Sequence, residues 1–303
     1  MTATREAEAE GEGEAPDVVV PAAWLADHLD DDDVVVVDVR DEWEYGGIGH
    51  LPGAVNVPFE RFRSAEGDEG MLPGADVWRE LLSEAGIATD DTIVAYDDTS
   101  GVFAARFLVT ALAYGHRTLH LLDGDYSAWT RDHETSREAP DRPRTDYEVR
   151  EPVHDPFVDY EEVAALVATA DDATADRGTS DGEQGTVPDE VVILDTREPW
   201  EWEEGHLPGA VQLDWRELVD EESRGLRPDD ELRAVLAEKG VTPGTRVVLY
   251  CNTARRISHT YLVLRHLGYD DVGFYEGSLT EWTERGGPVE SDDGTETGRD
   301  DET

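Results

Sequence analysis

The residues best suited to chemistry lie in one short stretch, VVLYCNTARRISHTY, at positions 247–261. It contains Cys251, the only cysteine of the chain, and the adjacent Arg255 and Arg256. A thiol beside positive charge ionises readily, and its thiolate is a nucleophile. Because a lone cysteine is more often a small buried hydrophobic residue, the functional interpretation depends on the surrounding sequence.

The flanking sequence predicts that Cys251 lies between a strand and a helix. Residues 247–250 are apolar, and from Ile257 to Gly268 apolar residues recur at helical spacing. Backbone N–H groups and the positive end of the helix dipole converge at such a junction. We therefore expect a catalytic Cys251 in a positive pocket whose substrate-binding residues are Asn252, Thr253, Ala254, Arg255 and Arg256.

Three blocks of sequence occur twice in the same order. Residues 34–59 match 191–215, residues 92–115 match 246–269, and residues 121–130 match 274–283. Three ordered matches indicate two copies of one domain. In the first copy the position of Cys251 is occupied by Asp97, so this copy has no nucleophile.

Each copy alternates apolar strands with amphipathic helices, the latter expected at 21–29, 76–86, 158–170 and 230–240. Buried strands of this kind predict an α/β fold in which helices flank a parallel sheet. We expect a first domain at 17–139, a linker at 140–156 and a second, catalytic domain at 157–289. Acidic tails are expected at 1–16 and 290–303, and a mobile acidic insertion at 171–189.

The composition limits the classes of partner. The chain of 303 residues carries 72 acidic against 25 basic residues, a net charge of −47, which disfavours binding to nucleic acid or anionic membranes. Such acidity with a normal apolar fraction, 38%, and 8 tryptophans indicates a folded protein adapted to concentrated salt. A single cysteine excludes an internal disulfide and a multi-cysteine metal site. With an acidic N-terminus and no long apolar run, we expect a cytoplasmic protein.

Two motifs carry a family resemblance over about residues 17–290. The segments DVRDEWEYGGIGHLPGA and DTREPWEWEEGHLPGA, with GDYSAW and GSLTEW further on, resemble the signatures of tandem-domain rhodaneses. The resemblance implies that Cys251 takes a sulfane sulfur from a donor such as thiosulfate and passes it, as a persulfide, to cyanide or a thiol. It also implies an inactive first domain and no metal or organic cofactor.

The second domain departs from the best-known two-domain members at two places. Glu201 stands where those members usually carry an anion-binding arginine, and residues 252–254 read Asn-Thr-Ala rather than a basic or Gly-Ser-Gly pattern. We interpret Asp195, Arg197 and Glu201 as supporting residues, an ion-pair brace, because Asp38, Arg40 and Glu44 repeat them. The matched His50 and His206 indicate a conserved turn, and Trp129 and Trp282 indicate core positions.

Three alternative functions remain open. The nearest is sulfur transfer from 3-mercaptopyruvate by the same cysteine. A second is an interaction module or a persulfide carrier for one protein partner, since fold alone does not define function. A phosphatase of related fold is disfavoured, because its Cys-x5-Arg loop would need an arginine where this chain has Ile257.

Overall fold

The computed structural model describes residues 18–63, 71–175 and 191–291. The predicted N-terminal tail and residues 176–189 of the predicted insertion lie outside these ranges. Residues 171–175 do not form a loop, because helix α5 (Tyr160–Ala175) continues through them. Glu290, assigned to the C-terminal tail, instead forms an antiparallel bridge with His206.

The first domain is built on a five-stranded sheet of order β1-β5-β4-β2-β3, and its strands are parallel. The β-branched run at 34–38 forms an internal strand between β4 and β3, and all five of its residues are buried. The strands are β1 (Val19–Pro21), β2 (Val34–Asp38), β3 (Val55–Asn56), β4 (Thr92–Tyr96) and β5 (Leu119–Asp123).

The second domain repeats this arrangement with the parallel order β7-β6-β8-β9. Phe157 forms a parallel bridge with Phe274 at the edge where the first domain carries β1. The strands are β6 (Val191–Asp195), β7 (Val211–Gln212), β8 (Arg246–Tyr250) and β9 (Val272–Phe274). The predicted α/β fold with two related domains is confirmed.

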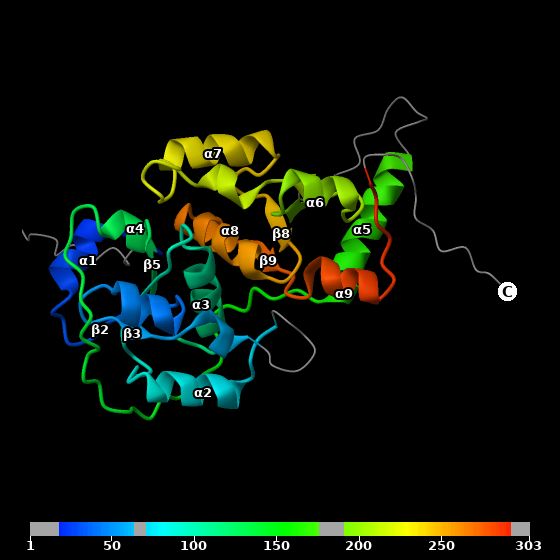
Figure 1. Ribbon diagram of the computed structural model, residues 1–303. Helices are drawn as coiled ribbons and strands as arrows, with labels where there is room; N and C mark the ends of the chain where they lie inside the picture. Colours follow the sequence, from blue (N-terminus) through cyan, green and yellow to red (C-terminus); the bar gives the residue numbers. More distant parts are fainter. Residues whose placement is uncertain (1–17, 64–70, 176–190, 292–303) are drawn as a thin grey trace, which may run out of the picture.

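Helices flank both sheets (Figure 1). The four predicted amphipathic segments are α1 (Ala22–His28), α2 (Ala75–Glu84), α5 and α7 (Asp229–Glu238). The remaining helical elements are η1 (Glu44–Ile48), η2 (Phe59–Phe62), α3 (Val102–Ala113), α4 (Tyr126–Trp129), α6 (Pro199–Glu204), η4 (Trp215–Leu218), α8 (Arg255–His266) and α9 (Ser278–Glu284). No helix within the described ranges is long and apolar enough to cross a membrane.

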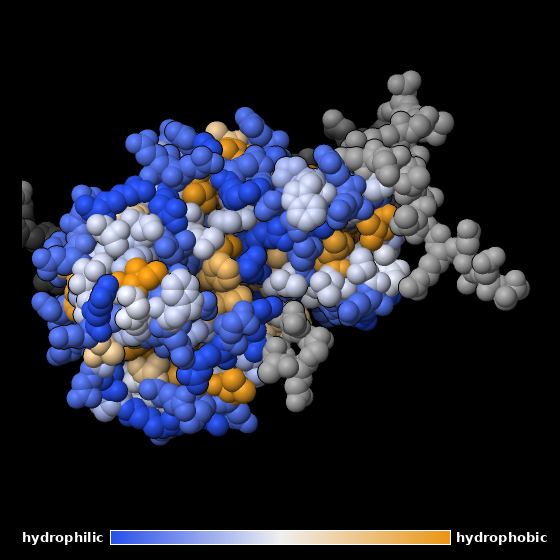
Figure 2. Space-filling view, in the orientation of Figure 1, coloured by the Kyte–Doolittle hydropathy of each residue, from blue (hydrophilic) through white to orange (hydrophobic). Residues whose placement is uncertain are grey.

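The two domains meet along α3 and α8, which lie side by side at the centre of the molecule (Figure 1). One hydrophobic core cluster contains residues of both domains. Ion pairs cross the boundary: buried Arg106 of α3 pairs with Glu276, and Arg224 pairs with the buried Asp125 at 2.6 Å. The face seen in Figure 2 is mostly hydrophilic at its periphery, and apolar residues are visible at its centre, where the domains meet.

The predicted linker is packed against the first domain along much of its length. Tyr147 is fully buried, and the Arg150 N–H donates to the Tyr114 oxygen at 3.0 Å. At Gly115, whose φ is +79°, a Cβ would lie 2.4 Å from the Arg150 carbonyl oxygen, so a larger residue would displace the linker. The segment up to Arg150 thus belongs structurally to the first domain, whereas Pro156 at its end accepts the Phe274 N–H of the second domain.

Candidate active site

Cys251 directly follows β8, and α8 begins four residues later. Its side chain is buried. Both polar groups of its backbone are hydrogen-bonded: the N–H donates to Ser278 Oγ at 3.1 Å, and the carbonyl oxygen accepts from the Leu279 N–H at 2.9 Å. Ala254 has a φ of +63°, which turns the chain sharply into the helix. Thr253 lies half-buried in this turn. The predicted strand–loop–helix setting of the thiol is present.

Arg256 is the charged side chain most firmly fixed beside the loop. Its Nη2 donates to Glu201 Oε1 at 2.9 Å, and its Nη1 makes a shorter contact with Glu201 Oε2. Burial lowers the pKa of Arg256, but the hydrogen bond to Glu201 and the nearby Cys251 raise it above its usual value. Asn252 donates to the same carboxylate at 2.7 Å. Glu201 therefore connects α6 to two residues of the cysteine loop.

Asp195 and Arg197 form the predicted ion pair at the end of β6. Arg197 Nε and Nη2 donate to the Asp195 carboxylate at 2.9 and 2.6 Å, and Nη2 also donates to the Gly205 oxygen at 2.6 Å. Arg197 Nη1 lies 3.5 Å from Asn252 Oδ1. This buried pair ties the GHLPGA turn to the strand and reaches the cysteine loop through Asn252.

Arg255 does not share the surroundings of Arg256. Its guanidinium carbon lies 4.7 Å from the centre of the Phe103 ring, which belongs to α3 of the first domain. Burial, followed by the charge of Arg256, lowers the pKa of Arg255. Because successive residues of an α-helix are rotated by about 100°, adjacent arginines at its start point in different directions. The structure thus separates two side chains that the sequence placed in one pocket.

The histidines and tryptophans singled out by the repeat have structural environments. Trp129 and Trp282 are buried, and each indole N–H donates to a backbone oxygen, at 2.9 and 2.7 Å. The His206 ring stacks on Trp202 with a centroid distance of 3.5 Å, and His50 stacks on Tyr45 at 3.8 Å. Both predictions, core tryptophans and turn histidines, are confirmed.

Three residues that hold the site were not singled out in the sequence. Ser278 accepts the Cys251 N–H, and its own hydroxyl donates to the Tyr275 oxygen at 2.9 Å. Glu276 lies between them in sequence and pairs with Arg106 of the first domain. The repeated GSLTEW motif marks the position of Ser278, but no local pattern predicts a contact between domains.

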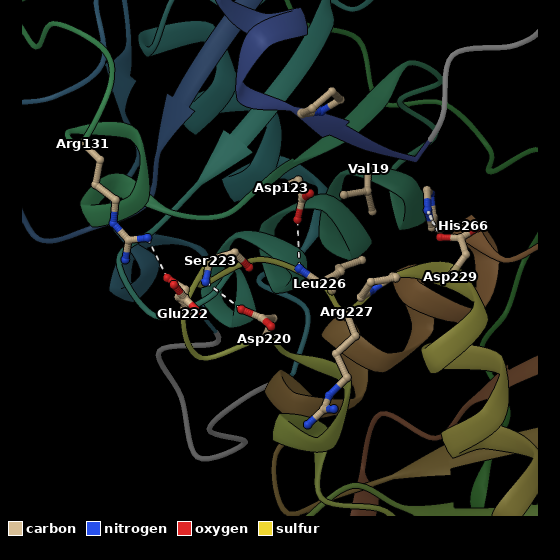
Figure 3. Close-up of a pocket in the computed structure, with 12 residues that line it drawn as sticks. Val19, Asp123, Arg131, Asp220, Glu222, Ser223, Leu226, Arg227, Asp229 and His266 are labelled. Carbon is tan, nitrogen blue, oxygen red and sulfur yellow. Dashed lines mark hydrogen bonds and ion pairs between the residues drawn. The ribbon is translucent and has the colours of Figure 1, made fainter.

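One cavity lies between the domains, and Cys251 is not among its lining residues. It has a volume of about 750 Å³, with Val19 and Asp123 on one side and Asp220, Leu226 and His266 on the other (Figure 3). The Leu226 N–H donates to Asp123 Oδ1 across it at 2.9 Å. Its lining contains no nucleophilic thiol, and the first-domain and second-domain sides are joined by this bond.

A family model for the rhodanese-like domain matches residues 21–132 and again 183–285. The chain belongs to the rhodanese family. A putative thiosulfate sulfurtransferase of Mycolicibacterium smegmatis is 31% identical over 90% of this chain and 98% of its own length. A putative thiosulfate sulfurtransferase of Haloferax volcanii is 30% identical over 91% and 97%.

Solved structures of this family share the two-domain fold. SseA from Escherichia coli, described as a 3-mercaptopyruvate sulfotransferase, has a TM-score of 0.70 and 24% identity over 87% of this chain and 99% of its own. The Tum1 protein of Saccharomyces cerevisiae has a TM-score of 0.75 and 20% identity over 89% and 96%. At these identities the structures bear on the fold of the rhodanese chain and not on its substrate.

Proposed function

We propose that this rhodanese-family sulfurtransferase moves a sulfane sulfur from thiosulfate to cyanide or a thiol through a persulfide on Cys251. The observation that supports it most is the position of the sole thiol, at a strand end and a helix N-terminus, next to Arg256. The names of the relatives that match nearly the whole chain support thiosulfate as donor.

The reaction requires two displacements at sulfur. The Cys251 thiolate attacks the outer sulfur of thiosulfate, the S–S bond of the donor breaks, and sulfite leaves with the bonding electron pair. The acceptor then attacks the outer sulfur of the persulfide, and Cys251 recovers its electron pair as a thiolate. With cyanide as acceptor the product is thiocyanate. Each step consumes and releases only these species.

The cysteine loop has the groups that this charge flow needs. Negative charge passes from thiolate to persulfide and back at one position, so fixed N–H donors there stabilise both steps. Arg256 adds a full charge, and Glu201 holds its guanidinium in place while offsetting part of that charge. Asn252, Thr253 and Ala254 complete the proposed substrate-binding set, and Asp195 and Arg197 support it. Arg255, which the sequence placed in this set, lies against Phe103 of the first domain instead.

The experiment that tests this function is intact-mass analysis of the purified chain after exposure to thiosulfate. We expect one added sulfur atom in the unmodified chain and none in Cys251→Ser, with sulfite released in equal amount. Subsequent cyanide should remove the sulfur as thiocyanate. A parallel exposure to 3-mercaptopyruvate tests the alternative donor. If sulfur is loaded from 3-mercaptopyruvate and not from thiosulfate, 3-mercaptopyruvate is the donor. No loading from either donor would contradict a persulfide mechanism.

A protein thiol is the other acceptor class. A reduced protein acceptor offered to the sulfur-loaded chain distinguishes a carrier from an enzyme that serves small thiols. Rapid transfer to cyanide and to small thiols favours the enzyme, whereas transfer confined to a protein thiol would reassign the chain as a carrier.

A further inference from the structure

A second cavity, of about 410 Å³, lies beside the Asp97 loop of the first domain. Its lining includes Arg40, Arg63 and Phe103 from that domain and Arg255 from the second, but not Cys251. It therefore brings three guanidinium groups and five carboxylates to one small space, in a chain whose net charge is −47.

Arg40 contributes a buried hydrogen-bond donor without an acceptor. Its Nε and Nη2 are used by Asp38 and by the Gly49 oxygen, at 3.0 and 2.7 Å. Its Nη1 is buried and has no partner among the residues that the structure describes. In the second domain the matching Nη1 of Arg197 reaches Asn252. A buried unpaired donor on a charged group is costly, so an acceptor in the cavity would stabilise it.

The residue that matches Asn252 in the first domain is Asp98, and it does not satisfy Arg40. Asp98 instead accepts from Arg224 of the second domain, at 3.4 Å to its carboxylate and 3.0 Å to its backbone oxygen. The cross-domain ion pair thus removes the natural acceptor from the Arg40 side of the cavity.

Arg255 contributes a guanidinium that lacks an anion. Within residues 18–63, 71–175 and 191–291 its guanidinium packs on the Phe103 ring and makes no hydrogen bond or ion pair. Phe103 in turn packs edge-to-face on Phe59, over which Arg63 lies at 5.2 Å. Two aromatic rings therefore carry a guanidinium at each end, which holds positive charge at the cavity wall.

The acidic groups that line the cavity are already engaged. Asp97 accepts four backbone N–H groups of its own loop. Glu60 pairs with Arg63 at 3.1 Å. Asp41 accepts the Trp43 indole N–H, and Glu44 accepts the Asp41 backbone N–H. The groups in the cavity that still lack a hydrogen-bond partner among the described residues are therefore donors, Arg40 Nη1 and the Arg255 guanidinium.

We propose that this cavity is a second anion site, separate from the sulfur-transfer site, that binds a small oxyanion between Arg40 Nη1 and the Arg255 guanidinium. The ligand is a carboxylate or a sulfur oxyanion, because both offer oxygens to two guanidinium groups. Arg255 is the first residue of α8 and follows Cys251 by four positions. An anion here would anchor the helix start to the first domain, which links occupancy of the cavity to the cysteine loop.

The test measures binding without turnover, so its failure is distinct from failure of the proposed sulfur transfer. Isothermal titration calorimetry with sulfate and, separately, with malonate is performed on the Cys251→Ser chain at the lowest salt that keeps it folded by circular dichroism. Thr99→Phe places bulk in the cavity from the first domain alone. We expect Thr99→Phe and Arg255→Gln each to weaken binding of the preferred anion at least tenfold.

The matched control is Arg216→Gln, which removes a half-exposed arginine from a neighbouring cavity, where it pairs with Asp214. It should leave affinity within twofold. Tighter binding of sulfate would identify the ligand as a sulfur oxyanion, and tighter binding of malonate would identify it as a carboxylate. Unchanged affinity in both Thr99→Phe and Arg255→Gln, or no saturable binding of either anion, would overturn the proposal.

Discussion

The Asp97 loop and the Cys251 loop turn in nearly the same way but begin with different groups. The first begins with a carboxylate and the second with a thiol. Ser100 and Ala254 occupy matching positions with φ values of +51° and +63°. In the first domain the Asp97 carboxylate accepts the N–H groups of Thr99, Gly101, Phe103 and Ala104 at 2.7, 2.8, 2.7 and 3.1 Å. The loop is therefore an anion-binding nest that its own side chain fills.

The second domain begins the same loop with a thiol. A thiol carries no fixed charge and ends closer to the backbone, so the N–H groups of the nest are available to a thiolate or a persulfide. Burial raises the pKa of Asp97, and its four N–H donors offset only part of that rise. The comparison indicates that the first loop is closed by the carboxylate of its own first residue, whereas the second begins with an uncharged thiol.

The carboxylates that follow the two Asp-x-Arg pairs also differ. Glu44 accepts only the N–H of Asp41 among the described residues, which closes its own turn. Glu201 reaches Arg256 and Asn252. The reason lies in the partner position: where α8 has Arg256, α3 has Val102. The arginine–glutamate support thus holds the Cys251 loop alone among the two loops, whereas the Asp97 loop is contacted by Arg224 of the second domain through Asp98.

The largest expected effect is that of Cys251→Ser. Because the chain contains no other thiol, we expect sulfur transfer from thiosulfate to cyanide to fall to background while the circular dichroism spectrum is unchanged. Substantial transferase activity in this folded variant would show that the nest, and not the nucleophile, separates the two loops.

Arg256→Ala tests the charged support of the second loop. Loss of one charge-assisted contact to the donor should lower kcat/KM for thiosulfate by about thirtyfold, corresponding to about 2 kcal/mol. The paired variant Arg256→Ala with Glu201→Gln removes the carboxylate left unpaired and should recover part of this loss. The control Arg216→Ala should stay within twofold. Equal kinetics of Arg256→Ala and the unmodified chain would remove Arg256 from the site.

A buried histidine, His259, should make the stability of the second domain depend on pH in a way that the first domain does not share. His259 is fully buried, neither ring nitrogen has a partner among the described residues, and burial lowers its pKa from 6.5 to about 4; the first domain has Ala105 at this position. Between these values the unfolded chain binds the proton and the folded chain does not, so stability falls as pH drops from about 6.5 to about 4. The loss reaches on the order of 3 kcal/mol.

The measurement is urea unfolding from pH 7 to pH 4, with tryptophan fluorescence as the signal. His259→Phe should flatten the acid loss of stability, whereas the exposed His154→Gln should reproduce the slope of the unmodified chain. A slope that persists in His259→Phe would assign the acid sensitivity to other groups.

The smallest effect is expected for Asp97→Ala, the counterpart of Cys251→Ser. Removing a carboxylate from a nest without a nucleophile should leave kcat within about threefold, although the four freed N–H groups should lower stability. The observable is kcat with thiosulfate and cyanide, corrected for the folded fraction. A loss as deep as that of Cys251→Ser would mean that the first domain takes part in the reaction.

The sequence alone was sufficient for the architecture and for the position of Cys251 between a strand and a helix. Apolar runs and helical spacing are local properties of the chain, so they predicted the strands, the helices and the loop that begins at Cys251. The duplication added a comparison within one chain, which identified Asp97 as the residue that replaces the thiol and correctly assigned His206 and Trp282 to structural positions.

The tertiary structure decided the direction of side chains and every contact between the domains. Arg255 and Arg256 are neighbours in sequence, yet a helix turns them apart, and only the packing of α3 against α8 places Phe103 under one of them. The contact of Arg106 with Glu276 likewise joins residues 170 positions apart. Such contacts depend on how two folded domains approach each other, and no local pattern of polarity records that approach.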